Sequence, residues 1–194
     1  MAFLKKIQRP ILRKRYKTIV DVCGGHGLLA MLFLILRKAT HAVVLDLNFP
    51  ESSNSLLNTF TATGLLPCPD AIKFIRGNLV ETLPTYLENE SCKEETAVFA
   101  IHACNFLTDV VIDQCINQGV SFACMPCCHA DRNNGQTQQA AKSVGLKVGE
   151  AVDIMRMGSI QDRGFSCYFR VLEPGITPEN RILIGIPETN GICR

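Results

Sequence analysis

TIVDVCGGHG, from Thr18 to Gly27, is the stretch that decides the fold, together with AVVLDLN, from Ala42 to Asn48, further along the chain. An apolar strand leads into Asp21 and a glycine-rich turn, an apolar helix follows, and a second apolar strand ends in Asp46. Glycines let the backbone approach a ligand where a Cβ would collide, and a carboxylate that ends the second strand suits the two hydroxyls of a ribose. The two stretches therefore predict a nucleoside-binding crevice.

Length and composition indicate one ordered domain. The chain has 194 residues, of which 47% are apolar and 20% charged, so it can bury a sizeable core and is too short for two full domains. The longest apolar run, Leu28 to Leu36, falls short of the roughly twenty residues that a membrane span needs. We predict a buried helix there and no membrane partner.

The first seventeen residues carry seven Lys or Arg and no acid, so with a net charge of +2 overall the other residues sum to −5. We treat residues 1–17 as a basic N-terminal segment and residues 18–194 as a single domain. The segment is either a basic arm that touches RNA phosphates or another anionic surface, or a solvated segment packed over the first strand. A basic, acid-poor leader is also compatible with a transit peptide.

Ten cysteines would fit a secreted disulfide scaffold, but no signal peptide precedes the first strand, and several cysteines lie in apolar, strand-like runs. We predict reduced thiols and a cytoplasmic location, with organellar targeting as an alternative. The sequence does not indicate an oligomeric state.

Apolar strands alternate with amphipathic stretches, which is typical of βαβ units and a parallel sheet. The predicted strands are Thr18 to Val22, Ala42 to Asp46, Ile72 to Arg76, Ala97 to His102 and Val120 to Met125. The predicted helices are Leu28 to Lys38, Asn54 to Thr63, Val80 to Glu88, Leu107 to Asn117 and one or two within Gly135 to Gln161.

The end of the chain departs from this alternation. Two strand-like runs, Gly164 to Glu173 and Asn180 to Glu188, are joined by the short segment PGITPE. A connection of that length joins antiparallel neighbours far more easily than it holds a crossover helix. We therefore predict an α/β fold in which five parallel strands are followed by an antiparallel hairpin.

The glycine turn fits two kinds of cofactor. GHGLLA, from Gly25 to Ala30, satisfies the dinucleotide pattern of an NAD-dependent oxidoreductase. However, Asp21 would repel a pyrophosphate, and too few strands follow for a second mononucleotide half. Taken as D-x-x-x-G-x-G, the same residues place a carboxylate where it suits the ammonium and sulfonium of S-adenosylmethionine.

On these residues the chain resembles the class I S-adenosylmethionine-dependent methyltransferases, from about Thr18 to Pro187. The resemblance implies S-adenosylmethionine as the cofactor and a three-layer, Rossmann-like fold, with a mostly parallel seven-stranded sheet and an antiparallel C-terminal hairpin. Cys23 stands where the family usually has its first glycine. A non-catalytic binding protein of this fold is therefore an alternative, beside the NAD-dependent enzyme.

The resemblance also implies cofactor contacts at the ends of successive strands. The glycine loop would face the methionine part, Asp46 would accept from the ribose hydroxyls, and Leu47 and Asn78 would contact the adenine. The predicted cofactor-binding residues are Asp21, Gly24, Gly25, Gly27, Asp46, Leu47, Asn78 and His102. Each type also has an ordinary role, since glycines form turns and Asp or Asn residues cap helices.

IHACNFLTD, from Ile101 to Asp109, and FACMPCCH, from Phe122 to His129, close the fourth and fifth predicted strands. The residues then expected at one edge of the sheet are Cys23, His26, His102, Cys104, Cys127, Cys128 and His129. With DIMRMGSIQDRGF and ITPENRILIGIP, these segments look similar to a methyltransferase subgroup. It includes the methyltransferase-like domain of glutathione S-transferase C-terminal-domain-containing proteins and, more distantly, a tRNA ribose methyltransferase family. The subgroup has Gly where this chain has Asn105.

Zinc is an alternative for this cluster, because Cys124 and Cys127 have a C-x-x-C spacing. No second pair completes the ligand set, and side chains alternate along a strand, so these two thiols should point in different directions. We predict no metal, and thiols that line a tight pocket. Cys115 and Cys167 fit ordinary buried cysteines.

Methyl transfer is an in-line displacement in which the protein mainly aligns the reactants. For a hydroxyl or ring-nitrogen acceptor, His102 or His129 is the predicted proton acceptor, because imidazole titrates near working pH. Cys127 is the third predicted catalytic residue, as a contact to the acceptor or as a thiolate. RNA is the predicted acceptor, because of the basic segment and the subgroup similarity, although the chain has no Trp for base stacking.

Overall fold

The computed structural model of the chain describes residues 2–66, 68–129, 135–173, 175–177 and 179–188. Seven strands form one sheet in the order β3-β2-β1-β4-β5-β7-β6. The strands are β1 (Tyr16–Val22), β2 (Ala39–Asp46), β3 (Ile72–Arg76), β4 (Thr96–Ala100), β5 (Ser121–Cys124), β6 (Phe165–Val171) and β7 (Arg181–Pro187). The pairs among β1 to β5 are parallel, and β7 is antiparallel to both β5 and β6. The predicted sheet and its terminal hairpin are confirmed.

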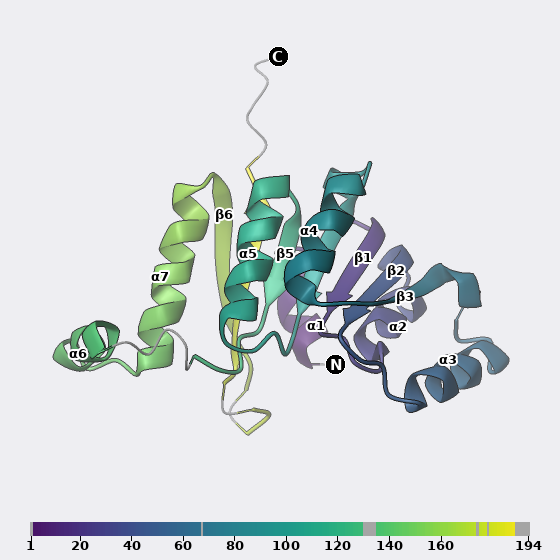
Figure 1. Cartoon of the computed structure of the whole chain (residues 1–194), viewed down its shortest axis with the longest axis horizontal. Helices are drawn as coiled ribbons and strands as arrows, with labels where there is room; N and C mark the ends of the chain where they lie inside the picture. The colour runs from purple at the N-terminus through teal and green to yellow at the C-terminus, as the bar shows by residue number, and fades with distance from the viewer. Residues whose placement is uncertain (1, 67, 130–134, 174, 178, 189–194) are drawn as a thin grey trace, which may run out of the picture.

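Helices cover both faces of the sheet, so the fold has the predicted three layers (Figure 1). The helices are α1 (Ala2–Ile7), α2 (Leu28–Ile35), α3 (Ser52–Ala62), α4 (Leu79–Asn89), α5 (Phe106–Gln118), α6 (Gly135–Ser143) and α7 (Val148–Asp162), with single turns η1 (Pro69–Ala71) and η2 (Lys93–Glu95). One core cluster lies beneath α1 and α2, and the other beneath α4, α5 and α7. Helix α6 packs on α7.

Several predicted boundaries were wrong by two or three residues. Strand β1 begins at Tyr16 and β2 at Ala39, both earlier than predicted, while β4 ends at Ala100, so His102 lies in the following loop. Helix α2 stops at Ile35 because Arg37 takes a left-handed backbone with φ of 54°. A residue in that conformation ends a helix because it turns the chain, and the Arg37 and Lys38 N–H groups then donate back to the Leu34 and Phe33 carbonyls.

The apolar run from Leu28 to Leu36 is a buried helix, as predicted. Four of its side chains, Ala30, Met31, Phe33 and Leu34, are at most 2% exposed. Among the described residues, no helix combines the length and the apolar character that crossing a membrane requires.

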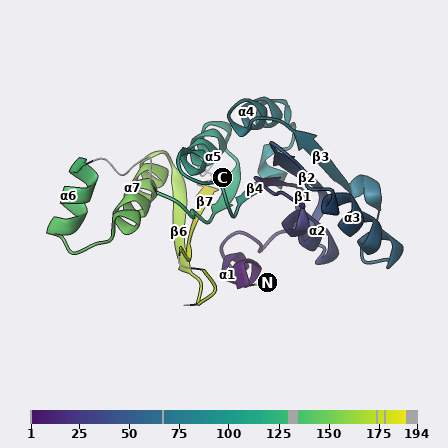
Figure 2. The same ribbon diagram turned by 60° about the horizontal axis from the view of Figure 1, so that its bottom comes forward.

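The basic leading segment contains a helix that the sequence did not predict. Five apolar side chains of the segment are buried in the core: Phe3, Leu4, Ile7, Ile11 and Leu12. Figures 1 and 2 show α1 at the edge of the sheet from which α4 and α5 begin, which is the edge of the loops that follow β1 and β4. The segment therefore packs on the domain while most of its charged side chains stay exposed.

Candidate active site

The glycine loop after β1 is built for close packing. A Cβ on Gly24 would lie 2.7 Å from Val44 and 2.8 Å from the Asp21 carboxyl carbon. Gly27 has φ of 72°, and a Cβ there would lie 2.9 Å from the Phe74 ring. Such separations are shorter than van der Waals contact, so only glycine fits at both positions without rearrangement. The loop consequently lies directly on the ends of β1 and β2.

Asp46 holds this loop from the neighbouring strand. Its Oδ2 accepts a hydrogen bond from the Gly25 N–H at 2.8 Å, and its Oδ1 accepts one from the Asn48 N–H at 3.1 Å. The parallel register pairs Asp21 with Val44, so Asp21 and Asp46 lie at the same edge of adjacent strands. Each carboxylate oxygen keeps acceptor capacity for a ligand hydroxyl.

Asp21 is buried beneath the loop, with 3% of its surface exposed. Burial, with a smaller contribution from the nearby Asp46, raises the pKa of its carboxyl group to about 7, although a hydrogen bond from the Ala30 N–H lowers it. Within the described part of the chain, no Lys or Arg forms an ion pair with Asp21. A buried carboxyl group without a cation is a site that a cationic ligand would stabilise.

A cavity of about 260 Å³ opens onto Asp21. It is lined by Asp21, Cys23 and Gly24 from the glycine loop, by leucines of α2, by Ile101 and His102 after β4, and by Phe3 and Leu4 of α1. This volume is below the range of pockets that enclose a whole drug-sized ligand. The cavity suits a small cationic and apolar part of a ligand, such as an amino-acid chain.

Five of the eight predicted cofactor residues do not line this cavity: Gly25, Gly27, Asp46, Leu47 and Asn78. Leu47 is 63% exposed directly after Asp46. Asn78 caps α4, since its Oδ1 accepts from the Val80 N–H at 3.1 Å. The predicted adenine contacts of both residues therefore stay predictions.

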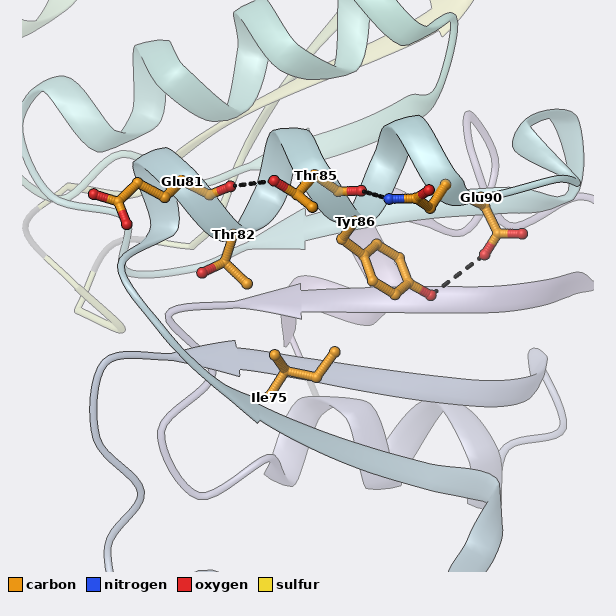
Figure 3. Close-up of a pocket in the computed structure, with 7 residues that line it drawn as sticks. Ile75, Glu81, Thr82, Thr85, Tyr86 and Glu90 are labelled. Carbon is orange, nitrogen blue, oxygen red and sulfur yellow. Dashed lines mark hydrogen bonds between the residues drawn. The ribbon is translucent and has the colours of Figure 1, made fainter.

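A second, larger cavity of about 460 Å³ lies between β3 and α4, beside Ile75 and Tyr86 (Figure 3). Its polar groups are used within α4, where the Tyr86 hydroxyl donates to Glu90 and the Thr85 hydroxyl donates to the Glu81 carbonyl. None of the predicted site residues lines this cavity. The cavity at Asp21 is the better candidate because the glycine loop and an unpaired carboxyl group meet there.

The cysteines and histidines at the sheet edge do not form one group. His26 and His102 are exposed, whereas His129 is nearly buried and its Nε2 lies 3.1 Å from Asp153 Oδ1. The thiols of Cys104, Cys127 and Cys128 do gather, with all three Sγ atoms within 4.8 Å of one another. Burial and the neighbouring thiols raise the pKa of Cys127 to about 12, which disfavours the predicted thiolate role at neutral pH.

A buried ionic network positions His129. Asp153 accepts hydrogen bonds from Arg156 and Arg181, and Arg156 also donates two hydrogen bonds to Asp109, at 2.9 and 3.1 Å. These residues connect α5, α7, β7 and the loop after β5. Sequence reasoning quoted the segments that contain them but assigned them no role, because most of their partners are far apart in the chain, the i,i+3 pair of Asp153 and Arg156 excepted.

Asn105 begins α5 in a strained conformation. Its φ of 56° and ψ of −128° lie in a region that is almost restricted to glycine, and its buried Oδ1 has no hydrogen-bond partner in the part of the chain that the structure describes. The predicted departure from a subgroup glycine therefore falls on a backbone that glycine would adopt freely. Strain and an orphaned acceptor at a sheet edge are typical of functional positions.

Comparison with known proteins identifies the fold. Residues 1–134 match the family model described as a methyltransferase domain. The chain belongs to this methyltransferase family. The matched segment contains the glycine loop, Asp46, Asn105 and the three gathered thiols, whereas α7, which supplies Asp153 and Arg156, lies beyond it.

Curated relatives and solved structures agree with this assignment. The chain is 24% identical over 203 residues to the Glutathione S-transferase C-terminal domain-containing protein of Xenopus laevis, with 88% of the chain aligned to 31% of that protein. The human protein of the same name is 25% identical over 121 residues, covering 45% of the chain and 19% of its own length. The chain thus spans about a third or less of the length of these relatives.

Solved structures share the fold at low identity. An O-methyltransferase family protein of Burkholderia thailandensis superposes with a TM-score of 0.55 and 18% identity, covering 89% of this chain and 51% of its own. An rRNA methylase of Streptococcus thermophilus superposes with a TM-score of 0.54 and 12% identity, covering 91% of this chain and 90% of its own. An O-methyltransferase from neocarzinostatin biosynthesis, solved with S-adenosylmethionine, superposes with a TM-score of 0.51 and 16% identity, covering 89% of this chain and 49% of its own. The predicted class I methyltransferase fold is confirmed.

Proposed function

We propose that this S-adenosylmethionine-dependent methyltransferase modifies RNA, with a tRNA-like molecule as the favoured acceptor. The observation that carries the choice of donor is Asp21, a buried carboxyl group that lines the cavity beneath the glycine loop and has no cationic partner among the described residues. An ammonium group of the ligand would supply the missing charge.

The residues present fit this cofactor. Gly24 and Gly27 let the loop pack directly on the ends of β1 and β2, where a Cβ would collide with neighbouring side chains, and Asp46 offers acceptor oxygens for ribose hydroxyls at the same edge. S-adenosylmethionine, when bound, supplies a methyl group on a positively charged sulfur that becomes neutral on transfer. Binding and alignment are then the main tasks of the chain.

His102 is the best-placed residue to accept a proton from the acceptor. It is exposed and lines the same cavity as Asp21, whereas His129 is held by Asp153 and lies outside the cavity lining. A base within reach of the reacting group contributes about 10²- to 10⁴-fold to such a reaction. Cys127 stays a predicted contact to the acceptor.

The leading segment supports RNA as the acceptor. Phe3 and Leu4 form one wall of the cavity, and the exposed Lys5 and Arg9 lie close to them in the chain. In contrast, Lys14 donates to the Glu94 carbonyl and Lys17 to the Cys92 thiol, both next to the start of β4 and so at the opposite edge of the sheet. One of the similar folds also belongs to an rRNA methylase.

Transfer of a radiolabelled methyl group from S-adenosylmethionine to total RNA, tRNA, protein and small hydroxylated aromatic compounds tests this function. We expect label in RNA, and RNA affinity that falls steeply with salt. The Lys5→Gln and Arg9→Gln double variant should bind RNA less tightly and reduce the salt slope by about two, while it keeps affinity for S-adenosylhomocysteine.

Lys73→Gln is the matched control, because Lys73 is exposed on β3, the strand at one edge of the sheet, away from α1. Its RNA affinity should equal that of the unmodified protein. Label only in protein or in small aromatics would overturn the RNA acceptor, and failure to bind S-adenosylhomocysteine would overturn the whole function.

A further inference from the structure

Three thiols meet where the loops after β4 and β5 adjoin. The Sγ atoms of Cys104 and Cys127 are 2.6 Å apart, and those of Cys127 and Cys128 are 3.7 Å apart. All three lie within 4.8 Å of one another and are partly exposed. The loops come from strands that are adjacent in the sheet, so the cluster is a product of the fold rather than of a local sequence motif.

Apolar packing does not account for these thiols. Cys115 and Cys124 are buried members of the core cluster under α4, α5 and α7, and Cys23 and Cys167 pack against it. Cys104, Cys127 and Cys128 belong to neither core cluster. A free cysteine usually behaves as a small hydrophobic side chain, so three that gather outside the core call for another role.

The spacing suits a soft metal ion. Thiolate ligands at about 2.3 Å from a tetrahedral ion are roughly 3.8 Å apart, close to the separation of Cys127 and Cys128. Cys104 and Cys127 are closer than the non-bonded contact of two sulfur atoms, and a shared ion would let them separate by about 1 Å.

We propose that Cys104, Cys127 and Cys128 bind one soft, thiophilic metal ion, zinc(II) or copper(I), beside the cofactor loop. Soft thiolates select these ions over magnesium or calcium. Three thiolates complete a trigonal copper(I) site, while zinc(II) takes a fourth ligand from solvent or from a bound molecule.

The surroundings hold the two ligand loops in place. Two hydrogen bonds join the first loop to α5. The Cys104 carbonyl accepts from the Leu107 N–H at 3.1 Å, and the Ala103 carbonyl accepts from the Thr108 hydroxyl at 2.5 Å. Asp109 of the same helix is bound to Arg156, which also binds Asp153, the partner of His129 next to Cys128. Arg156 therefore links α5, which follows the Cys104 loop, to α7, whose Asp153 holds His129 next to Cys128.

Metal content of the full chain, purified under reducing conditions without added metal, is the first measurement. We expect elemental mass spectrometry to find about one equivalent of bound zinc or copper per chain. After chelation, titration with zinc(II) and, anaerobically, with copper(I) against a coloured competitor chelator identifies the preferred ion. Cobalt(II) should give a thiolate charge-transfer band.

Cys104→Ser, Cys127→Ser and Cys128→Ser should each weaken metal binding by at least about tenfold. Cys68→Ser is the matched control, because Cys68 is exposed and shortly precedes β3, which is an edge strand of the sheet and is not adjacent to β4 or β5. All four variants should keep the circular dichroism spectrum of the folded protein.

Two results would overturn this site. One is that the reduced protein binds neither ion more tightly than a variant lacking all three thiols. The other is a mass two hydrogens lower under reducing conditions, with Cys104 and Cys127 recovered as a linked peptide, which would make the pair a stable disulfide.

Discussion

Asp21 and Asp153 are both buried aspartates, and their surroundings are opposite. Burial raises the pKa of Asp21 to about 7, because no cation in the described chain offsets it. Burial alone would also raise the pKa of Asp153, but hydrogen bonds from His129 and Arg181 outweigh it and lower that pKa. The comparison distinguishes a carboxyl group that a cationic ligand would stabilise from one that the protein's own cations already stabilise.

Removing the cation from the paired region should have the largest effect. Arg156→Met leaves two carboxylates, Asp109 and Asp153, without the guanidinium that they share. We expect the free energy of unfolding to fall by about 3 to 5 kcal/mol, measured by urea denaturation at pH 7. Arg163→Met, which removes an exposed pair with Asp113, should cost less than about 1 kcal/mol. Equal losses in both variants would contradict the assigned network.

Asp21→Asn should act in the opposite direction on stability. A folded pKa raised from 3.8 to about 7 means that the ionised carboxylate destabilises the empty protein above pH 7, and that this cost disappears as the pH falls toward 4. The variant should therefore gain up to about 4 kcal/mol at pH 8 and little at pH 4.

The same variant should lose roughly 100-fold in affinity for S-adenosylhomocysteine, because a charged hydrogen bond to the ligand is removed. Asp70→Asn, at an exposed position, should change neither quantity. Unchanged ligand affinity in Asp21→Asn would show that this carboxyl group is not the cation site.

Ligand binding by the unmodified protein should depend on pH through Asp21. A cationic ligand selects the carboxylate, so affinity should weaken toward tenfold per pH unit as the pH falls below about 7. Calorimetry in buffers of different ionisation enthalpy should detect proton release on binding. An affinity that is constant from pH 8 to pH 5.5 would argue against this linkage.

The smallest expected effect is at Asn105. Asn105→Gly removes a strained backbone conformation and a buried acceptor that has no partner among the described residues. The free energy of unfolding should therefore rise by about 1 to 2 kcal/mol, which a higher melting temperature would report. Asn58→Gly, in the exposed middle of α3, should instead lose up to about 1 kcal/mol. A loss of methyl transfer in Asn105→Gly would indicate that the strain serves the acceptor.

The two regions also differ in how well the sequence predicts them. The glycine loop and Asp46 lie within one βαβ unit, and strand β3 has the bounds that its apolar pattern predicted. Apart from the i,i+3 pair of Asp153 and Arg156, the network around Asp153 depends on pairs that are 24 to 47 residues apart, which no local periodicity encodes. Helix α1 was missed because its charges outweighed the apolar spacing of Phe3, Leu4 and Ile7.

The metal prediction shows the same limit. C-x-x-C spacing drew attention to Cys124 and Cys127, but Cys124 is buried in β5, and Cys127 lies instead beside Cys104 from the loop after β4. Whether thiols converge is decided by which strands are neighbours, and that order is a property of the whole sheet.

The position of β7 constrains how the chain can be made. This strand lies between β5 and β6, although it follows β6 in the chain. Until β7 pairs, β5 has an open edge and β6 has no partner in the described sheet, so a partly folded chain exposes two strand edges at once. A chaperone that shields unpaired strands would therefore aid the yield of this protein.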